Sequence, residues 1–158
     1  VIVFGYHRLG WKICEALKEK EVKFAVVDCD PLAIDKMIKR NIPYFFGEAN
    51  DIEFLSELPL DKIRMAISTI PRAEDQIALI KYIRTVNSKS LIITSLTHTN
   101  YLDEIYDCGA NYTIIPHLIS GQWIGDILKE KQWSKRTFTA LRAEQRKEMR
   151  LRFNLERN

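Results

Sequence analysis

Apolar residues in this chain gather in short runs, separated by longer segments in which apolar positions recur every three or four residues. A run of four to seven apolar residues without alternation is typical of a buried parallel strand, and the wider spacing is typical of an amphipathic helix. The runs predict strands at residues 1–4, 24–27, 43–46, 64–70, 91–94 and 112–116. The segments between them predict helices at residues 11–20, 31–40, 52–57, 71–86 and 100–108.

Six strands, each followed by a helical segment, indicate a parallel sheet that helices cover on both faces. We therefore predict an α/β fold, a Rossmann-like doubly wound six-stranded parallel sheet, for residues 1–116. From residue 117 onward the pattern is helical only. Residues 117–158 are therefore predicted to form a C-terminal helical extension.

The two helices of the extension differ in character. The first carries an apolar face with two glycines, Gly121 and Gly125, one turn apart. This face could cover the sheet or form a dimer contact, and the residues predicted for that contact are Ile119, Trp123, Ile124 and Ile127. The second helix, at about residues 134–154, is polar and basic, with few apolar positions, namely Phe138, Leu141, Met149 and Phe153. A helix this polar is either solvated or needs a partner.

The turn between the first strand and the first helix carries most of the candidate chemistry. Its sequence is Gly5-Tyr6-His7-Arg8-Leu9-Gly10, which matches the dinucleotide fingerprint G-x-G-x-x-G except at its middle position. In that fingerprint the first glycine makes the tight turn, and the last allows helix and strand to pack closely. The middle glycine lets the backbone approach a pyrophosphate, and here His7 takes its place. Crowding by His7 disfavours a dinucleotide and leaves room for a smaller nucleotide.

Other candidate residues follow the next strands, at the edge where open α/β sheets bind ligands. Asp28 stands at the tip of the second strand, where an acid contacts a ribose in nucleotide-binding proteins, and an exposed loop acid is the alternative. Cys29 and Asp30 adjoin it. The third and fourth strands add a set of residues that could contact the nucleotide or serve as helix caps and surface positions: Gly47, Glu48, Ala49, Asn50, Ser68, Thr69, Ile70 and Arg72.

Composition and charge exclude several classes of protein. The chain has 158 residues and a formal net charge of +3, and residues 135–158 hold a surplus of five basic residues. The body is therefore not a nucleic-acid binder by charge. Three scattered cysteines and three scattered histidines predict no metal site and no disulfide framework. The chain begins with Val1 inside a predicted strand, so we expect it to be a piece of a longer protein.

The order of these motifs resembles a known family, the RCK or KTN (TrkA-N) nucleotide-binding regulatory domain of potassium channels and transporters. The resemblance spans about residues 1–128 and is strongest with the Kef-type monovalent cation:proton antiporter branch. It rests on residues 3–10, 27–31, 46–50, 67–71, 108–112 and 115–118. The sequence departs from the family pattern at His7 and at Glu48, where Gly-Asp-Ala is usual. The residues after the domain are too few for the C-terminal lobe of many channel members, which favours the antiporter branch.

The resemblance implies a non-enzymatic domain at the cytoplasmic face of the membrane, joined to a transmembrane transport domain. It also implies a homodimer that gates transport when an adenine nucleotide binds, either AMP, ADP, ATP or NAD(H). Without an arginine directly after Asp28, a 2′-phosphate cofactor is less expected. Two alternatives remain: an NAD-dependent oxidoreductase, and a dimerising scaffold that has lost nucleotide binding.

Overall fold

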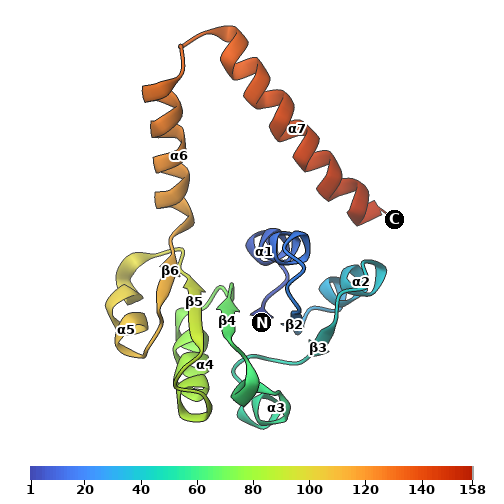
Figure 1. The fold of residues 1–158 in the computed structure, drawn as a ribbon, viewed down its shortest axis with the longest axis vertical. Helices are drawn as coiled ribbons and strands as arrows, with labels where there is room; N and C mark the ends of the chain where they lie inside the picture. Colours follow the sequence, from blue (N-terminus) through green and yellow to red (C-terminus); the bar gives the residue numbers. More distant parts are fainter. Residues whose placement is uncertain (158) are drawn as a thin grey trace. The chain divides into compact units, whose positions relative to one another are not determined.

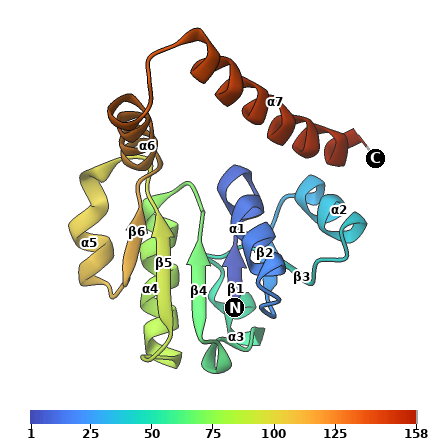
Figure 2. The ribbon, with the colours of Figure 1, turned by 45° about the horizontal axis from the view of Figure 1, so that its top comes forward.

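The computed structural model describes the backbone of residues 1–157 and the side chains of residues 1–150. The chain divides into two compact units, Val1–Pro116 and His117–Asn158. In the first unit, six strands form one parallel sheet in the order β3-β2-β1-β4-β5-β6 (Figure 2). Their bounds are β1 Ile2–Phe4, β2 Ala25–Asp28, β3 Tyr44–Phe46, β4 Met65–Ser68, β5 Leu91–Ser95 and β6 Tyr112–Ile114. The predicted Rossmann-like fold class is confirmed.

Helices cover both faces of the sheet (Figure 1). They are α1 Arg8–Glu19, α2 Pro31–Lys39, α3 Ile52–Glu57, α4 Ala73–Val86 and α5 Leu102–Asp107, with short 3₁₀ turns at η1 Leu60–Lys62 and η2 Thr99–Tyr101. Side chains of α1 and α2 pack with Val3 of β1, whereas side chains of α3, α4 and α5 pack with Ile2 and Phe4. Successive residues of a strand point to opposite faces. Strand β1 therefore contributes side chains to the hydrophobic cores on both faces of the sheet.

Three predicted helices begin at other residues than expected. Helix α5 starts at Leu102 rather than at residue 100, because residues 99–101 form a 3₁₀ turn. Helix α1 starts at Arg8, three residues before the predicted start, because Arg8, Leu9 and Gly10 already form its first turn. Helix α4 starts at Ala73 rather than at residue 71, since Arg72 has extended backbone angles and occupies the cap position. The shifts of α1 and α4 lie in loops at the carboxyl edge of the sheet that line the cavity region, so they change which residues belong to those loops.

Local capping explains several helix ends. Asp30 accepts the Leu32 N–H at 2.9 Å at the start of α2, and Asp51 accepts the N–H groups of the first turn of α3. Helix α5 ends at Asp107, and Gly109, two residues later, has φ +107°. The N–H of Gly109 and that of the residue after it donate to carbonyls of the last turn at 2.9 and 3.2 Å. This is the Schellman pattern, in which glycine takes the left-handed position.

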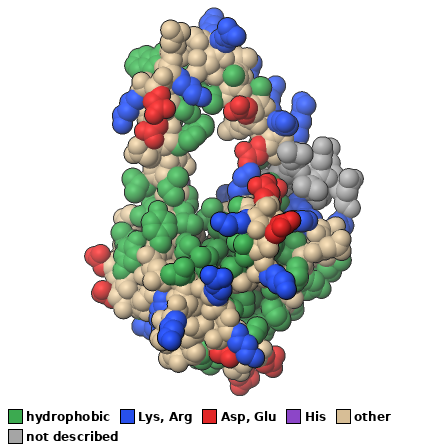
Figure 3. Space-filling model, in the orientation of Figure 1, with side chains coloured by type: hydrophobic (Ala, Val, Ile, Leu, Met, Phe, Trp, Pro, Cys, Tyr) green, Lys and Arg blue, Asp and Glu red, His purple; other side chains and the backbone are tan. Residues whose placement is uncertain are grey.

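The second unit holds α6 Pro116–Glu130 and α7 Lys135–Arg157. Ser134 caps α7, since its hydroxyl accepts the Thr137 N–H at 3.2 Å. Basic side chains lie along α7, as Figure 3 shows. The side chain of Phe153, one of the apolar positions predicted for this helix, lies outside the described residues. Among the described residues, no helix is both long and apolar enough to cross a membrane.

Candidate functional site

A cavity opens at the carboxyl edge of the sheet, where β1 lies between β2 and β4. The helix after β1 covers one face and the helix after β4 covers the other, so the loops after these strands diverge. This is the switch point at which open α/β sheets bind ligands. The cavity has a volume of about 260 Å³ and is lined by Gly5, His7, Val27, Asp28, Cys29, Gly47, Glu48, Ala49, Asn50, Ile70, Pro71, Arg72 and Asp75.

The turn after β1 requires both of its glycines. Gly5 has φ +93°, a conformation that residues with a Cβ rarely adopt, and an added Cβ would lie 2.7 Å from the Thr69 hydroxyl. An added Cβ on Gly10 would overlap the carbonyl oxygen of Gly5, because the first turn of α1 packs directly on the loop. The turn therefore brings the N-terminus of α1 against the end of β1.

His7 is tolerated at the middle position because the backbone there is ordinary. Its φ of −86° and ψ of −153° are available to any L-residue, and its side chain is exposed at the cavity rim. Among the described side chains none caps the start of α1, and its first turn holds no acidic residue. The first N–H groups of α1 therefore have no side-chain cap, and they lie at the positive end of the helix dipole.

Asp28 is buried and ties two loops together. Its carboxylate accepts the Tyr6 N–H at 2.6 Å through one oxygen and the Asp30 N–H at 2.9 Å through the other. A carboxylate offers about four acceptor positions, so both oxygens keep capacity for a further donor. Asp28 thus lines the cavity as a fixed hydrogen-bond acceptor.

The fourth strand supplies a second buried tie. The Thr69 hydroxyl lies 3.1 Å from the Phe4 carbonyl and 3.0 Å from the Gly5 carbonyl, and it donates to this pair. The Thr69 N–H also donates to the Phe4 carbonyl at 2.8 Å. Thr69 therefore holds the glycine turn against β4 and does not face the cavity. Ser68 is also buried, and its hydroxyl has no partner among the described side chains.

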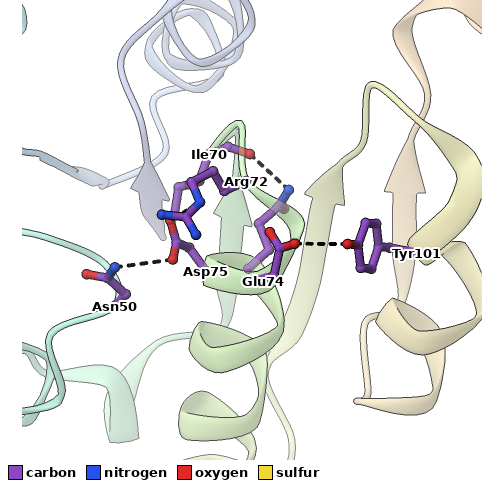
Figure 4. A network of polar contacts seen from close by, with 7 residues as sticks. Asn50, Ile70, Arg72, Glu74, Asp75 and Tyr101 are labelled. Atoms are coloured by element: carbon purple, nitrogen blue, oxygen red, sulfur yellow. Dashed lines mark hydrogen bonds and ion pairs between the residues drawn. The ribbon is translucent and has the colours of Figure 1, made fainter.

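The cavity wall formed by the loops after β3 and β4 is held by two exposed side chains and one half-buried carboxylate (Figure 4). Asn50 donates to Asp75 at 3.2 Å, and Arg72 lies 3.7 Å from the other oxygen of the same carboxylate. The Arg72 side chain is 71% exposed and that of Asp75 is 21% exposed. Asp75 therefore joins the loop after β3 to the loop after β4. Sequence reasoning missed Asp75, although its spacing of three residues from Arg72 on a helix is a known signal for an ion pair.

Tyr6 points away from the cavity, toward a cation–π cluster. Its hydroxyl accepts a hydrogen bond from Arg40 at 2.7 Å, and the Arg40 guanidinium lies 5.8 Å from the Tyr6 ring and 5.5 Å from the Trp11 ring. Burial raises the pKa of Tyr6, and the bond from Arg40 opposes that rise. The cluster fixes the glycine turn from behind, and no sequence signal connected Arg40 with that turn.

The cavity thus gathers ten of the predicted site residues, and the others lie around it. Gly10 packs under the loop, Asp30 caps α2, and Arg8 and Leu9 begin α1. Cys29 is exposed at the cavity wall. Burial raises the pKa of its thiol, and the carboxylates of Asp28 and Glu48 raise that pKa further. Within the described part of the chain, no cluster of three metal-ligating side chains is found.

This chain belongs to the TrkA-N domain family, which matches residues 1–116. Among curated relatives, the chain is 23% identical over 128 residues to potassium channel protein 1 of Methanocaldococcus jannaschii. That match covers 80% of this chain and 38% of the relative. The chain therefore spans less than half of the length of the relative.

Solved structures share the fold. The TrkA-N domain of the inner membrane protein YbaL from Escherichia coli has a TM-score of 0.75 at 20% identity, covering 80% of this chain and 94% of that one. The Kef C-terminal domain of Shewanella denitrificans, bound to AMP, has a TM-score of 0.69 at 14% identity and covers 99% of this chain and 94% of that one. GsuK structures with ADP and with NAD have TM-scores of 0.69 and 0.62, at 19% and 18% identity. They cover 78% and 73% of this chain, and 33% and 21% of theirs.

Proposed function

We propose that this chain is the nucleotide-binding regulatory domain of a potassium or other monovalent cation transporter, in the manner of a cation:proton antiporter. The observation that carries the proposal is the cavity at the switch point. There, the buried Asp28 carboxylate at the end of β2 and the uncapped N-terminus of α1 follow neighbouring strands. An acceptor for a ribose and donors for a phosphate are the two features that nucleotide sites of this fold combine.

The proposed ligand is an adenine nucleotide, with AMP favoured over ADP, ATP and NAD(H). His7 projects a side chain where a pyrophosphate would approach the backbone, and the cavity of about 260 Å³ is small for a binding site. Three carboxylates, those of Asp28, Glu48 and Asp75, line the cavity and disfavour additional phosphate charge. AMP, ADP and NAD in structures of the same fold support the ligand class.

Each wall has a proposed role. The ribose hydroxyls donate to Asp28, and the adenine lies between the loop at Gly47–Asn50 and Ile70. The phosphate accepts hydrogen bonds from the N–H groups of the first turn of α1, at Arg8 and Leu9. The Arg72 side chain supplies a positive charge. The residues outside the cavity contribute by holding these groups in place.

The proposed partner is a second copy of the chain, joined through α6. Its side chains Ile119, Trp123 and Ile124 are 48%, 58% and 38% exposed, and apolar groups along α6 are visible in Figure 3. Ile127 is 7% exposed and offers a partner little surface. The dimer would be joined to a transmembrane transport domain of the parent chain, at the cytoplasmic face, and nucleotide would shift it between two arrangements. Such a shift requires different affinities for the two arrangements.

Titration calorimetry with AMP, ATP and NADH tests the site. We expect AMP to bind wild-type protein and Asp28→Ala to weaken that binding at least tenfold, because the ribose loses its acceptor. Since Asp28 also holds two loops, a second measurement is needed. AMP should slow alkylation of Cys29 at the cavity wall and leave that of Cys108, which lies elsewhere, unchanged. Unchanged affinity in Asp28→Ala, or equal effects on both thiols, would refute the site.

The relatives favour a regulatory domain over the NAD-dependent oxidoreductase, because the curated relative is named as a potassium channel protein. Hydride exchange between NADH and a candidate substrate would reverse that preference. His7 supports the dimerising scaffold that no longer binds nucleotide. A dimer by light scattering with no thermal stabilisation by any of the three nucleotides would establish the scaffold instead.

A further inference from the structure

Gln76 is a fully buried polar residue on the first turns of α4, one turn beyond Arg72, with 0% of its surface exposed. A polar side chain in such a position costs free energy unless hydrogen bonds compensate for the lost water. The residue lines no part of the cavity. Its burial therefore has to be explained by the bonds that it makes.

Those bonds join two separate parts of the fold. The Nε2 amide of Gln76 donates to the carbonyl of Ile70 at 2.9 Å and to the carbonyl of Ser95 at 2.7 Å. Figure 4 shows the bond to Ile70 at the cavity loop, beside Arg72 and Asp75. Ile70 forms part of the cavity wall, whereas Ser95 is the last residue of β5. One amide group thus holds the cavity loop after β4 and the end of the neighbouring strand β5 together.

A further bond continues this connection. The N–H of Leu96, which follows Ser95, donates to the carbonyl of Ile114 at 2.9 Å. Ile114 is the last residue of β6, and Pro116 begins α6 two residues later. Hydrogen bonds therefore run from the cavity wall through β5 to the end of β6, from which the chain enters α6.

The geometry of the amide gives this connection only one arrangement. Both Nε2 donors are used, while the Oε1 oxygen of Gln76 has no partner among the described residues. Rotation of the amide would place that oxygen against two carbonyl oxygens and lose both bonds. A movement of the Ile70 carbonyl must therefore move Ser95 or break a bond in a buried site, where an unpaired group is costly.

We propose that Gln76 is the positioning residue that couples occupation of the cavity to the ends of β5 and β6, and so to the start of α6. The inference rests on the proposed function, because it needs a ligand that displaces or fixes Ile70. Gln76 acts through the Ile70 and Ser95 carbonyls and does not touch the ligand. Its substitution changes the response to nucleotide more than it changes nucleotide binding.

Amide hydrogen exchange with and without saturating AMP tests the coupling, with AMP affinity measured separately by calorimetry. In wild-type protein we expect AMP to slow exchange of the Leu96 amide by about tenfold, within the usual range of coupling between sites. In Gln76→Met the slowing at Leu96 should fall to about twofold or less. The substitution should change AMP affinity by a smaller factor than it changes the slowing at Leu96. Exchange at the cavity loops should still respond to AMP in the variant.

Two matched controls separate coupling from lost stability. Tyr101→Phe removes another bond from the start of α4, the one from the Tyr101 hydroxyl to Glu74 at 2.9 Å, without touching the cavity loop. Ser90→Ala removes a buried hydroxyl at the other end of β5. Both should keep the full response at Leu96. Should Gln76→Met fail to fold, Gln76→Glu keeps the size and, when protonated in its buried site, donates only one bond. It therefore cannot join both carbonyls, and the response at Leu96 should fall as in Gln76→Met.

The outcomes distinguish this inference from the proposed function. If AMP does not bind wild-type protein, the proposed function fails and the coupling fails with it. If AMP binds and protects the cavity loops but not Leu96, the site stands and the coupling is wrong. Full protection of Leu96 in Gln76→Met, or an equal loss of protection in Ser90→Ala, would also overturn the role of Gln76.

Discussion

The two walls of the cavity are held in different ways. The first wall consists of the loops after β1 and β2, where a buried carboxylate and two glycines fix the backbone. The buried hydroxyl of Thr69, which follows β4, donates to the backbone of this wall. The second wall consists of the loops after β3 and β4, where the exposed side chains of Asn50 and Arg72 meet the half-buried carboxylate of Asp75. Gln76 holds the second wall from behind.

This difference indicates that the two walls respond differently when a ligand binds. Buried bonds to the backbone stabilise a single conformation, because breaking them leaves unpaired groups away from water. Exposed ion pairs contribute little, so their partners can exchange for a ligand group at small cost. We therefore expect the first wall to be formed before a ligand binds and the second wall to rearrange around it.

The largest effect is expected at the base of the first wall. Gly10→Ala places a Cβ against the Gly5 carbonyl, so helix and strand must separate, and we expect a loss of about 3 kcal/mol in the free energy of unfolding. Gly125→Ala on α6 is the control, since its Cβ would have no described atom within 4 Å. That substitution should stabilise by about 0.5–1 kcal/mol through helix propensity. Urea unfolding measures both, and equal signs would contradict the contrast.

The next effect concerns the tie between the two loops of the first wall. Asp28→Ala leaves the Tyr6 and Asp30 N–H groups without their acceptor, and we expect a destabilisation of about 2–3 kcal/mol. Asp75→Ala in the second wall removes a more exposed carboxylate and should cost about 0.5 kcal/mol or less. Thermal unfolding of the two variants compares the walls directly. Similar losses would show that both walls are built alike.

A smaller effect is expected when a charge in the second wall is removed, and it concerns the preference between ATP and AMP. Asp75→Asn removes a negative charge from the cavity and frees Arg72, which should raise ATP affinity by about two- to fivefold, the range of an exposed ion pair. AMP affinity should rise less, because AMP carries less charge. Calorimetric titration of both nucleotides gives the ratio. Glu53→Gln on α3, outside the cavity, is the charge-matched control.

The smallest effect is expected at Cys29. Its raised pKa means that less thiolate is present at pH 8 than in a free cysteine. The alkylation rate should therefore increase with pH, and the midpoint of that increase should lie at a higher pH than for a free cysteine. Glu48→Gln removes one of the causes and should raise the rate at pH 8 by about twofold. Cys14 is an internal reference, because burial raises its pKa to about 12. A rate unaffected by Glu48→Gln would exclude that carboxylate as a cause.

Local patterns in the sequence predicted much of the fold. Short apolar runs marked all six strands, and aspartate before Pro31 marked the start of α2, because strand burial and helix capping depend on neighbouring residues. The start of α1 was placed too late, since its first residues lack an apolar face. Asp75 and Arg40 were missed because their partners, Asn50 and Tyr6, come from other segments of the chain.

The sequence by itself determined the class of fold, the glycine turn and the acid at the tip of β2, because each follows from residues close together in the chain. Only the tertiary structure decided which side chains reach the cavity. Parallel pairing sets Phe4 beside Val27 and Ser68, and that register places Thr69 behind the turn and Asp28 within reach of the Tyr6 N–H. Contacts between distant segments depend on strand register and helix packing, which no local pattern encodes.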